Sequence, residues 1–148
     1  MSLSFRKLCP ADLQAVIELM AASDSANLAP LGTSWSADQL KSECDEQLGW
    51  AAVDEAKRLV AFVFIRDLNV AWEVSLLATH PEYRGAGIMR RLLSHVLEQK
   101  PIDREFWLEV HEHNNPARRL YENMGLKAVG KRPAYYADRA AAILYNYG

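Results

Sequence analysis

The sequence predicts a mixed α/β domain, because short apolar runs typical of strands alternate with runs that place apolar residues on one helical face. The clearest example is residues 74–78, a strand-like run that leads through a glycine-containing turn into an amphipathic helix at residues 88–97. Half of the 148 residues are hydrophobic and about a quarter are charged, as in globular domains with a sizeable core. We therefore expect a single domain over residues 1–148.

The N-terminal third predicts one strand and two helices. Residues 2–8 alternate between apolar and polar types, which favours a strand. Residues 12–23 place their apolar side chains on one helical face, and residues 24–34 are small or turn-forming, which favours a loop. Ser36 and Gln39 have the spacing of a capping box, so a second helix is expected to begin there.

The central part predicts a run of strands around the amphipathic helix. Residues 50–53 and 59–65 are rich in apolar and β-branched side chains, and the short turn between them predicts a hairpin. Residues 70–78 predict the next strand, followed by the glycine turn and the helix at residues 88–97. Bulky aromatic and branched side chains at residues 105–111 predict the strand after that helix.

The C-terminal part predicts a short helix and a final pair of strands. Asn115 suits the N-cap of the helix and Pro116 suits its first position. Gly125 suits the left-handed residue that follows a helix end. Residues 126–131 and 141–147 predict the last two strands.

The glycine turn carries the strongest functional signal. Gly85 and Gly87 allow the backbone to approach a ligand closely just before a helix begins. The first amides of a helix have no partners within it, and the helix dipole favours negative charge there. Arg84, Arg90 and Arg91 add positive charge, so the segment predicts a pyrophosphate cradle. No Gly-Lys-Ser or Gly-Lys-Thr follows, which excludes the Walker pattern.

Two segments resemble the GNAT acetyltransferase superfamily. Residues 84–89, Arg-Gly-Ala-Gly-Ile-Met, resemble its Arg/Gln-x-x-Gly-x-Gly/Ala motif, which holds the pyrophosphate of acetyl-CoA. Met89 departs from the motif, so its side chain must point away from the phosphates or one amide contact is weakened. Residues 108–126 resemble the second signature, and within the superfamily they are most similar to the RimI type, which acetylates the N-terminal alanine of a small-subunit ribosomal protein.

The resemblance implies a fold and a cofactor site. The GNAT fold is a mixed, mostly antiparallel seven-stranded sheet flanked by about four helices. Its fourth and fifth strands, expected here at residues 70–78 and 105–111, splay apart, and acetyl-CoA enters that wedge. The residues implied to contact the cofactor are Leu77, Ala78, Thr79, Arg84, Gly85, Ala86, Gly87, Ile88, Met89, Arg90 and Asn114.

Acetyl transfer to an amine needs a neutral amine, a stabilised oxyanion and a proton for the departing thiolate. By resemblance to the RimI type, Glu109 is the base and Tyr121 is the acid. Glu73 on the neighbouring strand is an alternative base, and Glu109 could instead be a strand carboxylate paired with a basic side chain. Tyr121 could instead be only the polar rim of a helix face.

The acceptor site is less well defined by the sequence. The resemblance implies that Trp35, Tyr135 and Tyr136 contact the substrate, but residues 33–36 and 141–142 differ from the RimI pattern. We expect a protein N-terminal α-amine as the acceptor, with a ribosomal protein as one candidate. The alternatives are a small amine, such as a polyamine, amino acid or aminoglycoside, and a CoA-binding module without catalysis. The acidic residues Glu43, Asp45 and Glu46 predict a solvated helix face that could also attract a cationic acceptor.

Several other classes of function are not expected. A net charge of −2 argues against a nucleic-acid partner, and no apolar run is long enough for a membrane span. His111 and His113 lack a third ligand at a fixed spacing, so we expect surface histidines and no metal. Cys9 and Cys44 form no paired motif, which favours a reduced, cytoplasmic protein. The chain could be a monomer or a homodimer.

Overall fold

The computed structural model describes residues 2–25 and 35–147. Its core is one seven-stranded sheet, in which neighbouring strands follow the order β1-β2-β3-β4-β5-β7-β6. The strands are β1 (Ser4–Lys7), β2 (Leu48–Val53), β3 (Leu59–Asp67), β4 (Ala71–Thr79), β5 (Glu105–His111), β6 (Lys127–Arg132) and β7 (Ala142–Tyr147). Every neighbouring pair is antiparallel except β4 and β5, which are parallel. The predicted mixed, mostly antiparallel sheet is therefore confirmed.

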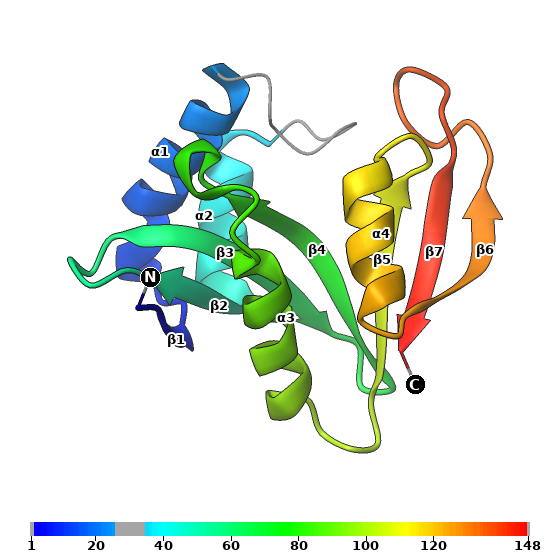
Figure 1. Ribbon diagram of the computed structural model, residues 1–148, viewed down its shortest axis with the longest axis horizontal. Coiled ribbons are helices and arrows are strands. Elements are labelled where there is room, and N and C mark those ends of the chain that lie inside the picture. The colour runs from blue at the N-terminus through cyan, green and yellow to red at the C-terminus, as the bar shows by residue number, and fades with distance from the viewer. Residues whose placement is uncertain (1, 26–34, 148) are drawn as a thin grey trace.

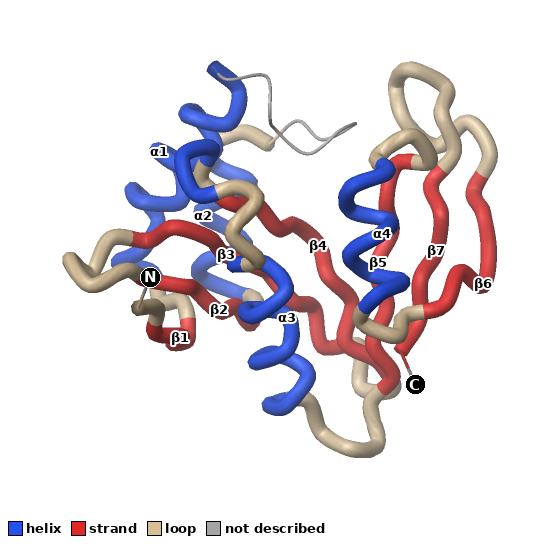
Figure 2. Tube along the Cα trace, viewed as in Figure 1, coloured by secondary structure: helices blue, strands red, loops and turns tan. Residues whose placement is uncertain are grey.

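In the described part of the chain, four helices cover the two faces of the sheet (Figures 1 and 2). They are α1 (Leu13–Ser25), α2 (Ala37–Glu46), α3 (Ile88–Gln99) and α4 (Asn115–Asn123). Two short 3-10 turns, Pro10–Asp12 and Pro81–Tyr83, precede α1 and α3. Of the loop expected at residues 24–34, residues 24 and 25 belong to α1, and residues 26–34 lie outside the described residues. No helix in the described part of the chain is long and apolar enough to cross a bilayer.

Two apolar cores hold the layers together. On one face, α1 and α2 pack on the sheet through residues such as Leu19, Leu40 and Phe62. On the other face, α3 and α4 pack on it through a larger cluster that includes Leu92 and Tyr121. Each helix thus buries one apolar face against the sheet, as the periodicity of the sequence predicts.

The helix ends follow local rules, with one exception. Ser36 accepts a hydrogen bond from the Gln39 amide at 3.1 Å, and the Gln39 side chain accepts one from the Ser36 amide at 2.8 Å, which confirms the capping box. Gly125 has φ +95°, the left-handed conformation expected after α4. The prediction of Asn115 as N-cap is wrong by one residue: Asn114 caps α4 by accepting a hydrogen bond from the Ala117 amide at 3.3 Å.

The strands β4 and β5 pair only at their beginnings. Their register runs from Ala71 beside Glu105 to Glu73 beside Trp107 and then stops. Beyond that point the two strands diverge (Figure 1). In addition, the pairing of β3 with β4 shifts at Ser75, which leaves this residue as a bulge. The predicted wedge between the fourth and fifth strands is therefore present, and it positions the candidate site.

Candidate active site

A cavity of about 570 Å³ occupies the wedge between β4 and β5. It is bordered by β4 on one side, β5 on the other, the glycine turn before α3, and the first residues of α4. The predicted site residues that line it are Leu77, Ala78, Thr79, Arg84, Gly85, Gly87, Ile88, Met89, Arg90, Glu109, Asn114, Tyr121 and Tyr136. The fold thus brings together residues that are up to 59 positions apart in the sequence (136 minus 77).

Three predicted site residues do not line this cavity. Ala86 is exposed within the glycine turn. Trp35 packs against the core beneath α1 and α2, in the cluster that contains Leu40. Tyr135 is 52% exposed and packs edge-on against Tyr136, which does line the cavity. These residues therefore lie beside the cavity or away from it.

The glycine turn has the geometry of an anion cradle. Gly85 and Gly87 have φ +82° and +74°, a region that other residues rarely adopt. A Cβ atom on either glycine would meet nothing within 4 Å, so open space adjoins the backbone at both positions. Gly87 is the N-cap of α3 and provides no side-chain oxygen to the amides of the first turn. These amides therefore suit a phosphate, because no side chain caps them.

A remote turn supports the cradle. The Tyr83 hydroxyl donates a hydrogen bond to Asp54 Oδ2 and accepts one from Arg58, each at 3.2 Å. Asp54 also accepts hydrogen bonds from the backbone amides of Ala56 and Arg58 at 2.9 Å, so the turn between β2 and β3 is itself fixed. Tyr83 borders the cavity directly before the glycine turn. Hydrogen bonds from the β2–β3 turn thus anchor the loop that precedes the glycine turn.

Met89, the residue that departs from the GNAT motif, is half-buried and packs against the larger core cluster. It also borders the cavity. Its side chain therefore provides an apolar wall that is anchored in the core. Its backbone amide is in the first turn of α3, beside the open space at Gly87.

The free edge of β4 faces the cavity. Leu77, Ala78 and Thr79 pair with β3 on one side, at Val63, Phe62 and Ala61. On the other side β5 has already diverged, so this stretch has no strand partner there. Backbone N–H and C=O groups need hydrogen-bond partners. The β4 edge can therefore bind an extended ligand with amide groups as an added strand would.

Glu109 lies on β5 and borders the cavity. Its side chain is 23% exposed, and Oε1 lies 3.0 Å from Nε of Arg132. The alternative of a strand carboxylate paired with a basic side chain is thus also realised at this residue. Glu73, the other candidate base, is half-buried at the apex of the wedge and does not line the cavity.

Tyr121 projects from α4 into the larger core and borders the same cavity. It is only 4% exposed, and its ring packs edge-on against Tyr145. Burial raises the pKa of Tyr121 well above its ordinary value, because the phenolate would lose its hydration. The phenol therefore keeps its proton at neutral pH, as an acid must before it donates.

The prediction of a surface position is wrong for His111. This ring is 4% exposed, stacks on Tyr136 at a centroid distance of 5.0 Å, and borders the cavity. Nδ1 accepts a hydrogen bond from the His113 amide at 3.1 Å, so Nε2 carries the proton and donates to Asp138 at 2.7 Å. His113 itself is exposed, as predicted. Both ring nitrogens of His111 are engaged, and the ring anchors the β6–β7 loop.

The prediction of a solvated acidic face on α2 is wrong for Glu43. This side chain is buried and accepts hydrogen bonds from Arg66 at 2.7 Å and from the Ser75 hydroxyl at 3.1 Å. Ser75 is the bulge residue of β4 and lines the cavity. Glu43 thus connects α2 to the strand that forms one wall of the site. Asp45 and Glu46 are exposed, as predicted.

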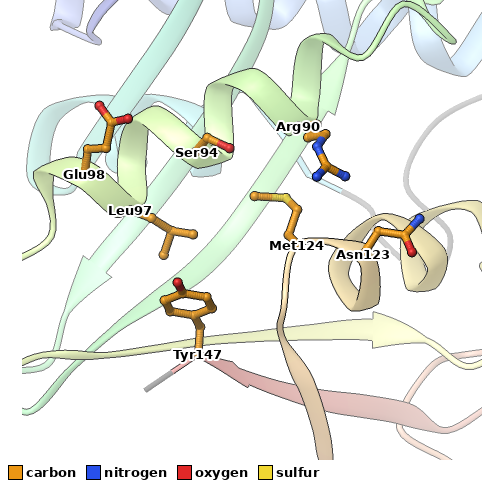
Figure 3. A pocket seen from close by; sticks show the side chains of 7 residues that line it. All are labelled: Arg90, Ser94, Leu97, Glu98, Asn123, Met124 and Tyr147. Carbon is orange, nitrogen blue, oxygen red and sulfur yellow. The ribbon is translucent and has the colours of Figure 1, made fainter.

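A smaller cavity of about 350 Å³ lies between α3, the end of α4 and Tyr147 (Figure 3). Arg90, Ser94, Leu97 and Glu98 border it from α3, and Asn123 and Met124 border it from the end of α4. Tyr147 completes the lining. Arg90 lines both cavities, so the smaller one lies close to the cavity that the glycine turn borders.

Comparison with known proteins adds to this geometry. Residues 14–126 match the sequence profile of the Acetyltransferase (GNAT) family. A 94-residue segment is 30% identical to peptidyl-lysine N-acetyltransferase YjaB of Escherichia coli and covers 64% of this chain and 59% of that protein. An 89-residue segment is 33% identical to N-alpha-acetyltransferase RimI of Mycobacterium tuberculosis and covers 60% of this chain and 51% of that protein. The chain thus spans little more than half the length of these curated relatives.

Among solved structures, the ribosomal-protein-S18-alanine N-acetyltransferase from Escherichia coli is similar with a TM-score of 0.85. The sequence identity is 25%, and the superposition covers 98% of this chain and 92% of that one. The agreement in fold therefore extends well beyond the two motifs, to nearly the whole chain. Together with the profile match, it shows that the chain belongs to the acetyltransferase (GNAT) family.

Proposed function

We propose that this protein transfers an acetyl group from acetyl-CoA to a primary amine, and that the acceptor is the N-terminal α-amine of a protein. The observation that carries the proposal is the single cavity in the wedge. A phosphate cradle borders it at the start of α3, and a carboxylate and a buried phenol border it between β4 and β5. Each group that amine acetylation requires thus has a candidate in one connected space.

The described residues fit acetyl-CoA. Gly85 and Gly87 leave open space beside amides that suit a pyrophosphate. The free edge of β4 suits the two amide groups of the pantetheine arm, which would bind along Leu77 to Thr79. The smaller cavity beyond Arg90 offers space for the nucleotide end. When bound, the cosubstrate supplies a thioester, the activated acyl group of the reaction.

The two candidate proton-transfer groups lie on opposite faces of the sheet. Tyr121 belongs to the core beneath α3 and α4. On β5, Leu108 and Val110 face that core, so the alternating side chain of Glu109 faces the side of α1 and α2. Both border one cavity, because the sheet is open between β4 and β5. This arrangement supports an approach of cosubstrate and acceptor from opposite faces.

In this proposal Glu109 removes the proton of the acceptor ammonium, directly or through a water molecule. Tyr121, whose phenol is protonated at neutral pH, donates a proton to the departing thiolate. Burial raises the pKa of Tyr121, so this phenol is a weaker acid than an exposed tyrosine and keeps its proton until the thiolate forms. Glu109 is preferred to Glu73 as the base, since only Glu109 lines the cavity. The bulge at Ser75 frees backbone groups of β4 close to the wedge, which suits stabilisation of the oxyanion.

Similarity to RimI and to the S18-alanine N-acetyltransferase favours the N-terminal α-amine of a peptide as the acceptor. Similarity to YjaB instead points to the side-chain amine of a peptide lysine. The test is thiol release from acetyl-CoA with three acceptors: a peptide beginning Ala-Arg, the same peptide with a blocked N-terminus and an internal lysine, and spermidine. The proposal predicts the fastest release with the first peptide and acetylation at its N-terminus by mass spectrometry. Release with the lysine peptide or spermidine alone would reject the N-terminal acceptor.

A further inference from the structure

The carboxylate proposed as the base is already bound by a cation of the same chain. Nε of Arg132 lies 3.0 Å from Oε1 of Glu109. Arg132 is the last residue of β6, the exposed edge strand, and β7 lies between β6 and β5. The Arg132 side chain must therefore extend across β7 to reach Glu109. It is 56% exposed, so water reaches it readily.

Small neighbouring residues leave a path for this side chain. Ala142 is the β7 neighbour of Arg132, and its methyl group is too short to block the crossing. Gly130 lies in the same cross-strand row as Leu144 and Glu109. A Cβ atom on Gly130 would lie 3.1 Å from Cδ1 of Leu144, so a larger residue would crowd this row. Ala142 thus leaves room for the Arg132 side chain, whereas Leu144 already fills the space beside Gly130.

Tyr135 completes what we call the acceptor cluster: Glu109, Arg132 and Tyr135. The Arg132 guanidinium carbon lies 5.8 Å from the centre of the Tyr135 ring, a cation–π contact. The negative charge of Glu109 raises the pKa of Tyr135, with further contributions from burial and a hydrogen bond to the same carboxylate. The Tyr135 hydroxyl and the guanidinium therefore both lie close to Glu109.

An amine acceptor needs the same carboxylate. At neutral pH a primary amine arrives largely as an ammonium ion. The guanidinium of an arginine remains charged at all working pH values, so it holds the carboxylate without being able to give up a proton to it. The pair is partly exposed, and such pairs are weak enough for another cation to replace. A carboxylate freed from a guanidinium also accepts a proton more readily.

We propose that Arg132 is a specificity-determining residue, whose guanidinium occupies the place on Glu109 that the acceptor ammonium takes. A cationic acceptor exchanges with it, whereas a neutral amine lacks the charge to do so. Arg132 therefore selects acceptors that arrive as cations and keeps Glu109 neutralised until one binds. This inference rests on the proposed function, because it assigns the acceptor position at the same site.

The test compares steady-state kinetics of three variants at saturating acetyl-CoA. Arg132→Gln removes the guanidinium that pairs with Glu109, and Arg132→Lys keeps a positive charge at this position. Lys127→Gln is the control, because it removes one positive charge from the exposed start of the same strand. The acceptor probes are the Ala-Arg peptide and spermidine. Arg132→Gln is expected to lower the acceptor KM by at least about threefold, in line with the loss of a partly exposed ion pair. Its kcat and its KM for acetyl-CoA are expected to remain close to the wild-type values, and Lys127→Gln is expected to leave all three constants unchanged.

An unchanged or higher acceptor KM in Arg132→Gln would overturn the inference. A fall in kcat at constant KM would overturn it too, because Arg132 would then orient Glu109 for the reaction. Failure of the proposed function is distinguishable, because the wild type would then release no thiol with any amine. If every variant stays inactive, both proposals fail.

Discussion

Nε2 of His111 lies 2.7 Å from Oδ2 of Asp138, which ties the end of β5 to the loop between β6 and β7. Asp138 also accepts a hydrogen bond from the Ala140 amide at 2.9 Å. The Tyr136 ring stacks on the same His111 ring. This one imidazole therefore positions the loop that carries both tyrosines expected at the acceptor site.

Replacement of His111 by asparagine is expected to release this loop. Asp138 would lose its buried donor and Tyr136 its stacking partner, so backbone amides of residues 135–140 should exchange with deuterium faster than in the wild type. Hydrogen–deuterium exchange read by mass spectrometry checks this, with the peptide that covers α3 as internal reference. His113→Asn is the matched control, since it keeps the backbone amide that donates to His111 and removes only an exposed ring, which lies 5.5 Å from the His111 ring between centroids. Equal exchange in both variants would show that the contact does not hold the loop.

Gly87→Ala is expected to weaken acetyl-CoA binding and to lower stability. An alanine at φ +74° costs about 1–2 kcal/mol, and its Cβ enters the open space of the cradle. Asn69→Ala is the control, because Asn69 has φ +71° in the β3–β4 turn, at the opposite end of β4. Both variants should melt at lower temperature. Only Gly87→Ala should raise the Kd for acetyl-CoA, by about tenfold if one amide contact is lost. Equal Kd values for both variants would argue against the cradle.

Glu43→Leu is expected to destabilise the protein by about 1–3 kcal/mol, because Arg66 and the Ser75 hydroxyl would lose their acceptor. Urea unfolding measures this loss. Asp45→Asn, on the exposed face of the same helix, should leave the unfolding midpoint unchanged, since surface ion pairs contribute little. If both variants unfold at the wild-type midpoint, the buried contacts of Glu43 contribute no stability.

Asp12 predicts a pH dependence of stability. Two hydrogen bonds from Arg6, each 2.8 Å long, are the main reason why the pKa of Asp12 is lowered. The folded-state pKa lies below the unfolded one, so this stabilisation is present above the ordinary value of 3.8 and is lost as the pH falls below it. Asp12→Asn should therefore flatten the acid side of the stability curve. Glu55→Gln, which replaces an exposed carboxylate, serves as control. If the free energy of unfolding falls with decreasing pH equally steeply in Asp12→Asn and the wild type, Asp12 does not cause this pH dependence.

The sequence was sufficient where local rules decide the structure. Ser36 with Gln39 and Gly125 at the end of α4 behave as their types predict, because a cap depends on the few residues around it. The choice between Asn114 and Asn115 was wrong because both are good caps and adjacent. The seven-stranded sheet and the splay of its fourth and fifth strands came from family resemblance, since periodicity does not determine which strands are neighbours.

Long-range partners explain the errors at the site. Glutamate is usually exposed and histidine is intermediate in burial. The burial of Glu43 and His111 depends on Arg66, Ser75 and Asp138, which lie 23 to 32 positions away. No local pattern marks such a pair. Arg132 was missed for the same reason, because it reaches Glu109 across an intervening strand. Glu109, Tyr121 and the glycine turn were expected from the spacing of the motifs, and all of them line the wedge cavity.

The central claim is that the wedge between β4 and β5 binds acetyl-CoA. Isothermal titration calorimetry with the purified chain tests it most directly, since it requires no knowledge of the acceptor. We predict association of one acetyl-CoA per chain, with the Gly87→Ala variant binding more weakly than Asn69→Ala. A wild-type protein that binds neither acetyl-CoA nor free CoA would contradict the account.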